Sequence, residues 1–177
     1  MLQKIALAIG CIIVLILGVA AMQPDDYKIT RSLVIAAPPS DVFAQINDFH
    51  KWAAWSPWEK KDLNMKKTFS GPAEGVGTIY DWSGNSDVGE GRMTLTASQP
   101  AEKIAIKMEF KKPFEDTGTA EFLFKPEGAG TNVSWSMAGK YNFISKVVCL
   151  FMSMDKMIGG DFEQGLSQLK TVVEAKK

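Results

Sequence analysis

The segment Lys103–Phe110 reads K-I-A-I-K-M-E-F and places an apolar residue at every second position. Successive side chains of a β-strand point to opposite faces, so Ile104, Ile106, Met108 and Phe110 fall on one face. This alternation is typical of a sheet with one face against a core and the other in water. The segment therefore predicts a half-buried β-strand.

The same two-residue period recurs on both sides of this segment. It covers Tyr27–Ile35, Tyr80–Trp82, Met93–Ala97, Ala120–Phe124 and Val133–Met137. Turn-forming residues separate the later runs, among them Gly84-Asn85, Gln99-Pro100 and Lys112-Pro113. Connections this short join antiparallel neighbours, whereas parallel strands need long crossovers. The chain therefore predicts an antiparallel sheet of about seven strands.

Helical patterns occur in two parts of the chain. After the first strand, Ser40 can cap a short helix that carries Val42, Phe43 and Ile46, and the tryptophan-rich segment from Phe49 predicts a second one that ends near Ser56 at Pro57. From Phe143 to about Glu174, apolar residues recur every three or four positions, which predicts one long helix that Gly159-Gly160 weakens locally. One helix cannot cover a wide curved sheet, so we expect an α+β fold with a cup between sheet and helix.

The N-terminal segment is apolar. Ile5–Met22 contains no charged residue, follows Lys4 and precedes Asp25 and Asp26. A bilayer-spanning helix needs about 20 apolar residues, and the positive-inside rule places the N-terminus in the cytoplasm. We expect a transmembrane signal anchor over residues 1–23 and a domain over 24–177 on the non-cytoplasmic side. A cleaved signal peptide, with Gly18-Val19-Ala20 at the cleavage site, is the alternative; the spacing around Cys11 does not suit a lipoprotein anchor.

Composition excludes several kinds of site. Lys plus Arg and Asp plus Glu both number 20, and this balance argues against nucleic acid as a partner. Two cysteines, Cys11 and Cys149, and one histidine, His50, are too few and too far apart for a zinc site or an evident disulfide. We therefore expect no metal and no cofactor. The composition gives no indication of oligomeric state.

Several stretches carry a family resemblance. They are A-A-P-P-S-D-V-F at 36–43, W-S-P-W-E-K at 55–60, F-S-G-P-A-E-G-V-G at 69–77, G-E-G-R-M-T-L at 89–95, G-T-N-V-S-W-S-M-A-G at 130–139 and M-D-K-M-I-G-G-D-F-E-Q-G-L at 154–166. With the order of predicted elements, these resemble the START-like, birch-pollen-allergen-like superfamily (SRPBCC), in its bacterial polyketide-cyclase/dehydrase-like branch. The resemblance implies a helix-grip fold around a hydrophobic cavity, and with the anchor it implies a single-pass protein of a bacterial inner membrane.

Candidate ligand-binding residues are apolar and lie on the inward phase of the predicted elements. They are Trp55, Trp58, Tyr80, Trp82, Met93, Met108, Phe110, Phe122, Trp135, Met137, Met154 and Ile158. An ordinary packed core is the alternative for each of them. Trp58 is the tryptophan of its segment that we expect at a ligand or membrane, with Trp52 and Trp55 mainly in packing.

Polar candidates for the cavity are few. Arg31 stands in the apolar phase of the first strand and is a candidate polar anchor for a ligand carboxylate or phosphate, unless a bulge turns it to solvent. Glu109, Asp81 and Asp155 fall outside the apolar phases, and His50 has no partners at the spacing of a catalytic triad. We assign no catalytic residue.

Three functions remain open from the sequence. The first is membrane-anchored binding or transport of a hydrophobic small molecule or lipid, with the bilayer as partner of the N-terminal helix. The second is a cyclase or dehydratase acting on a polyketide-like substrate, which predicts an ionisable residue in the cavity. The third is a protein-interaction module, which predicts a filled interior and an exposed apolar patch.

Overall fold

The sheet contains seven strands, and all neighbouring strands are antiparallel. The computed structural model describes residues 1–175, apart from the side chains of Leu2, Ala8 and Met154. The strands are β1 (Asp26–Ile35), β2 (Lys66–Ser70), β3 (Ile79–Ser83), β4 (Glu90–Gln99), β5 (Lys103–Lys112), β6 (Asp116–Glu127) and β7 (Gly130–Lys140). Their order is β1-β7-β6-β5-β4-β3-β2, so six strands form a meander and β1 joins its last strand. The sequence period predicted this sheet, apart from β2, which lacks a clear alternation.

Strand register places the inward residues opposite one another. Ile104 of β5 pairs with Phe122 of β6, and Phe122 pairs with Trp135 of β7. All three side chains are buried. Because directly paired residues share a face of the sheet, this row of large side chains forms one layer of the core. Met93 and Met108, paired between β4 and β5, extend the apolar face toward the cavity described below.

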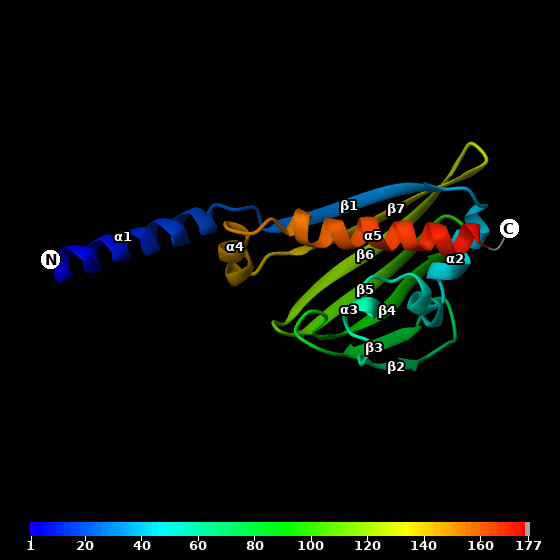
Figure 1. The fold of residues 1–177 in the computed structure, drawn as a ribbon, viewed down its shortest axis with the longest axis horizontal. Helices are drawn as coiled ribbons and strands as arrows, with labels where there is room; N and C mark the ends of the chain where they lie inside the picture. The colour runs from blue at the N-terminus through cyan, green and yellow to red at the C-terminus, as the bar shows by residue number, and fades with distance from the viewer. Residues whose placement is uncertain (176–177) are drawn as a thin grey trace.

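The long helix α5 (Met154–Glu174) lies across the concave face of the sheet, as Figure 1 shows. Its buried side chains Phe162, Leu166, Leu169 and Val173 recur at helical spacing. The sequence predicted that the helix would begin at Phe143, and this is wrong. The chain forms a separate helix α4 (Phe143–Cys149), and the Ser153 hydroxyl then caps α5 by accepting a hydrogen bond from the Lys156 amide.

Short helices close the end of the sheet beside the C-terminus of α5. Two were predicted and three occur: α2 (Pro39–Ile46), the 3₁₀ helix η1 (Phe49–Ala54) and the single turn α3 (Trp58–Lys61). The indole N–H of Trp52 donates to the carbonyl of Ile46 at 3.0 Å, and that of Trp55 donates to the carbonyl of Gln45 at 3.2 Å. Both buried tryptophans thus satisfy their polar atoms on the last turn of α2.

The N-terminal helix α1 (Leu2–Ala21) extends away from the domain at the end opposite the C-terminus (Figure 1). Among the described residues it is the one helix long and apolar enough to cross a membrane, over Gln3–Ala21. Most of its side chains are exposed, whereas Ala20 near its end is fully buried. Helix α1 packs against α4.

Candidate functional site

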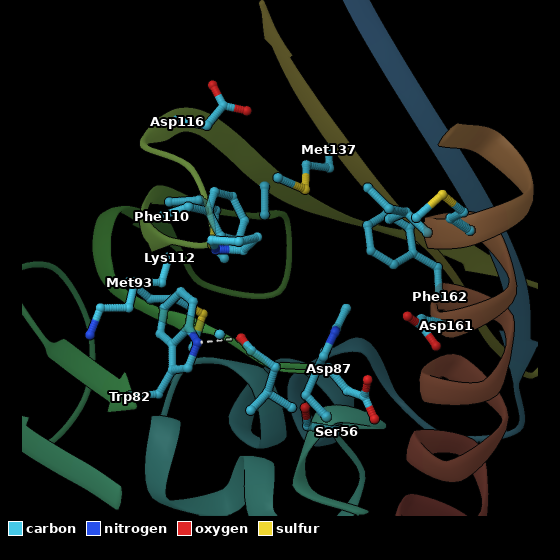
Figure 2. A pocket seen from close by; sticks show the side chains of 18 of the residues that line it. Ser56, Trp82, Asp87, Met93, Phe110, Lys112, Asp116, Met137, Asp161 and Phe162 are labelled. Carbon is cyan, nitrogen blue, oxygen red and sulfur yellow. Dashed lines mark hydrogen bonds between the residues drawn. The ribbon is translucent and has the colours of Figure 1, made fainter. Parts of the chain in front are cut away.

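A cavity of about 390 Å³ lies between the sheet and the first half of α5. Its volume falls within the range of about 300–1,000 Å³ that is usual for small-molecule sites. Strands β3 to β7 and Tyr27 of β1 form its floor, while α3, α5 and the start of α4 form its walls. Figure 2 shows Trp82, Met93, Phe110, Met137 and Phe162 directed toward a common space from four strands and the helix.

Most of the candidate ligand-binding residues line this cavity. They are Trp58, Tyr80, Trp82, Met93, Met108, Phe110, Trp135, Met137 and Ile158. On the strands they occupy alternate positions, as Tyr80 and Trp82 do on β3, because the inward phase of each strand faces α5. Five methionines contribute flexible thioethers that adapt to irregular ligands: Met65, Met93, Met108, Met137 and Met157.

The remaining candidates have other positions. Trp55 and Phe122 are fully buried and do not line the cavity, because other aromatic rings surround them. Trp55 lies edge-on to Phe122, with ring centroids 6.2 Å apart, and to Trp135, at 5.8 Å. These two side chains therefore belong to the packed core beneath the cavity. The prediction for Met154 concerns a side chain outside those that the structure describes.

Arg31, the candidate polar anchor, does not line the cavity either. Its guanidinium lies against α5, where Nη1 is 2.9 Å from Asp155 Oδ1 and Nε is 2.6 Å from Glu163 Oε1. The hydrogen bond from Arg31 holds the pKa of Asp155 below its ordinary value. With both carboxylates engaged, the guanidinium is structural: it joins β1 to α5.

Gly159 gives the guanidinium its space on the helix. A Cβ atom at this position would lie 2.2 Å from Nη2 of Arg31, whereas one at Gly160 would meet nothing within 4 Å. Asp155 stands four residues before Gly159 and Glu163 four residues after it, so all three lie on one face of the helix. The missing side chain of Gly159 leaves a space between the two carboxylates. The glycine pair was expected to weaken or bend the helix locally, and α5 runs through it without a break.

The hydroxyl of Tyr80 is a buried polar group of the cavity, and sequence reasoning had treated Tyr80 only as an apolar ring. The Tyr80 hydroxyl donates to Glu59 Oε1 at 3.1 Å, and Lys67 Nζ lies 2.5 Å from Glu59 Oε2. Burial, and then the nearby Glu59 carboxylate, raise the pKa of Tyr80 far above its ordinary value. The hydroxyl therefore stays protonated and places a donor beside a carboxylate in the cavity.

The acidic candidates from the sequence lie outside the cavity. Asp81 forms a two-pronged ion pair with Arg92, at 2.8 Å and 3.0 Å, and Glu109 pairs with Lys107. His50 stacks on Phe69 with centroids 4.1 Å apart, and its Nδ1 lies 2.9 Å from Asp48. Asp81, Glu109 and His50 therefore bind partners on the protein surface. They form no site together with Tyr80 and Glu59.

Other carboxylates stand at the edge of the cavity and were missed by the sequence reasoning. Asp87, Asp116 and Asp161 are among its lining residues, and Asp161 Oδ2 accepts a bond of 2.6 Å from Lys61. Figure 2 shows Asp116 and Asp161 at the margin of the apolar cluster. Glu59 follows Trp58 directly on the one-turn helix α3. This position next to a candidate ligand-binding residue was the sequence feature that could have identified it. The loop residues 86–89 and 113–115 carry no periodic signal.

Trp135 is the centre of the aromatic cluster below the cavity. Its ring lies 4.8 Å from that of Phe122 on β6 and 4.2 Å from that of Phe162 on α5, and both pairs are stacked. The indole N–H is buried and has no oxygen or nitrogen acceptor in the described part of the chain. The ring planes of Trp52, Trp55 and Trp58 make angles of 73–78° with the plane of Trp135. These are edge-to-face contacts, which aromatic pairs favour.

Comparison with known proteins extends over this whole domain. Residues 26–174 match the family described as polyketide cyclase / dehydrase and lipid transport. This span begins at β1 and ends with α5, so it contains every residue of the cavity. A comparison with curated proteins found no match.

Solved structures share the fold at low sequence identity. Protein CV1439 from Chromobacterium violaceum has a TM-score of 0.60 at 18% identity, over 86% of this chain and 99% of that chain. Ara h 8.0201 has a TM-score of 0.60 at 10% identity, over 85% and 99%. The di-domain ARO/CYC StfQ from the steffimycin biosynthetic pathway has a TM-score of 0.62 at 11% identity, over 86% and 52%. At these identities, the three structures show a similarity to this chain in fold alone.

Proposed function

The chain belongs to the polyketide cyclase/dehydrase and lipid transport family, and we propose that it is a membrane-anchored carrier that binds an apolar small molecule or lipid in its cavity. The observation that carries this proposal is the cavity itself. It is lined mainly by aromatic and methionine side chains and borders α5 and α4, and α4 packs against the apolar N-terminal helix.

The lining favours an apolar ligand over a charged one. Three of the five charged residues that line the cavity lie in ion pairs: Lys112 with Glu90, Glu59 with Lys67 and Asp161 with Lys61. Burying an acyl chain of about 16 carbons at about 0.8 kcal/mol per CH₂ yields roughly 12 kcal/mol. Association costs of about 4–15 kcal/mol oppose this gain. The balance suits a carrier that must also release its ligand.

Anchoring by α1 is the second part of the proposal. The charge-free run Ile5–Met22 follows Lys4 and has the length of a transmembrane helix, which supports residues 1–23 as the anchor and residues 24–177 as the domain on the non-cytoplasmic side. An uncleaved anchor would keep the cavity beside the bilayer that supplies an apolar ligand. A cleaved signal sequence would release the domain, and the size of the mature chain distinguishes the two.

One observation favours a cyclase or dehydratase as a second candidate function. Tyr80 presents a protonated hydroxyl next to the Glu59 carboxylate within an apolar cavity. Such a pair could donate a proton to a leaving hydroxyl while the carboxylate accepts one. Turnover would then release a product lighter than the substrate by one water, and Tyr80→Phe should abolish it.

A binding titration on the full chain in detergent tests the carrier proposal. Ala120 lines the cavity, so Ala120→Phe should fill it and weaken the binding of a fluorescent fatty acid about tenfold or more, the loss of about 1.4 kcal/mol or more. Ala129→Phe in the exposed turn after β6 adds the same ring to the surface and should leave binding unchanged. Equal binding by wild type and both variants would refute binding in this cavity.

A further inference from the structure

Helix α4 and the turn after it carry an exposed apolar surface that the cavity does not use. The α4 patch consists of Phe143, Ile144, Val148, Phe151 and Met152, each between 44% and 72% exposed. Single apolar residues on a protein surface are normal, but five exposed ones within ten consecutive residues concentrate apolar surface in one segment, which indicates a binding surface.

The patch carries no charge. Lys146 is the one charged residue from Tyr141 to Ser153, and its side chain is turned inward and buried. Its ammonium group donates to the carbonyl of Gln23 at 3.1 Å and lies 2.5 Å from Asp25 Oδ1. The exposed face of α4 therefore offers only apolar and small polar groups to its surroundings.

The same contacts fix α4 at the end of α1. Only Met22–Asp25 separates α1 from β1, and the bond from Lys146 to Asp25 is joined by one from the Tyr141 amide to the Asp25 carbonyl, at 2.8 Å. Four residues span at most about 14 Å even when extended. A bilayer crossed by α1 must therefore begin close to α4.

The cavity opens toward this end of the domain. Figure 1 shows α4, the start of α5 and the connection between β5 and β6 at the end from which α1 leaves. Phe114 in that connection and Met157 on α5 both line the cavity and are at least half exposed. Asn142 and Ser145 of the α4 segment also border it. The apolar rim of the cavity and the α4 patch thus share one side of the protein.

We propose that the α4 patch lies in the interfacial layer of the phospholipid bilayer that α1 crosses, so that the cavity exchanges its ligand directly with that leaflet. The inference rests on the proposed anchoring by α1. Its physical basis is the one that holds amphipathic segments in a membrane: apolar side chains enter the boundary between headgroups and acyl chains. Helix α4 acts as a second contact with the bilayer and sets the orientation of the cavity.

Fluorescence quenching in vesicles tests this placement. The full chain, with Cys11→Ala and Cys149→Ser, carries an NBD probe at Phe151→Cys in vesicles of phosphatidylcholine and phosphatidylglycerol containing a lipid with a shallow spin label. The matched control is Val76→Cys, also an exposed apolar position, in the connection between β2 and β3 whose Gly75 contacts Asn47 after α2. The Phe151 probe should shift to the blue and lose roughly half of its emission, as expected for an interfacial site, while the Val76 probe should keep its emission.

Flotation of the same vesicles separates the two ways in which the idea can fail. If the chain floats with the vesicles and the two probes are quenched equally weakly, the anchor holds and the α4 placement is overturned. If the chain does not float, anchoring by α1 fails and the placement fails with it. A probe at Ile144→Cys on the same patch should reproduce the Phe151 result, so a local effect of one substitution cannot decide the outcome.

Discussion

Alanine at the two adjacent glycines of α5 should have opposite consequences, because only Gly159 faces Arg31. Alanine in a helix interior is favoured over glycine by about 1 kcal/mol. A Cβ atom at Gly160 meets nothing within 4 Å, so Gly160→Ala should gain this stability. A Cβ atom at Gly159 would lie 2.2 Å from Arg31 Nη2, so Gly159→Ala must displace the guanidinium from Asp155 and Glu163.

The expected difference in melting temperature between the two variants follows from the close contact between the added Cβ atom at position 159 and the Arg31 guanidinium. Overpacked contacts cost about 1–3 kcal/mol, and in a chain of this size 1 kcal/mol shifts the melting temperature by about 2–4 °C. Thermal unfolding of the full chain in detergent, followed by circular dichroism, should place Gly160→Ala above wild type. Gly159→Ala should lie below Gly160→Ala by at least a few degrees.

A double-mutant cycle identifies the cause. In an Arg31→Ala background the penalty at Gly159 should disappear, because the displaced group is gone. If instead both alanines stabilise the protein equally in the wild-type background, the guanidinium does not lie against α5. Arg31 would then be free for the role that the sequence suggested, as a polar anchor for a ligand.

Three further predictions concern the cavity and its supports. Tyr80→Phe should reduce the free energy of unfolding by about 1.5–3 kcal/mol in urea titrations, since it removes a hydrogen bond to a carboxylate. Gly165→Ala places a Cβ atom 2.7 Å from Cζ3 of Trp135 and should cost about 1–3 kcal/mol by overpacking, despite the better helix former. The hydrogen bond from Lys146 lowers the pKa of Asp25 below 3.8, so its stabilising contribution is complete above that pH and is lost as the pH falls below it. Asp25→Asn should therefore flatten the acid side of the melting temperature measured against pH.

Local periodicity was sufficient for most of the fold. Strand β5 repeats apolar residues at every second position, and its register against β6 and β7 places those residues in one layer. The break between α4 and α5 could not be read from periodicity, because Leu150 and Phe151 continue the apolar spacing that Val147 begins. It depends on the cap at Ser153 and on the packing of α4 against α1, which is a tertiary contact.

The site was less predictable than the fold. The inward-pointing residues of a strand include both residues of the packed core and residues that line the cavity. Phe122 and Met137 both point inward, yet Phe122 is covered by Trp55 and Trp135 whereas Met137 borders the open space. Which inward residue reaches the cavity depends on where α5 lies over the sheet. Glu59 was missed for a related reason, since its partner Tyr80 is 21 residues away and only the fold brings them together.

Native mass spectrometry of the full chain, released from membranes in mild detergent, tests the central claim most directly. The account predicts a bound apolar molecule of defined mass on the wild-type chain and on Ala129→Phe, and its absence from Ala120→Phe when that variant remains folded. A wild-type chain without adduct after incubation with bilayer lipids, or an adduct equally present in Ala120→Phe, would contradict ligand binding in the cavity.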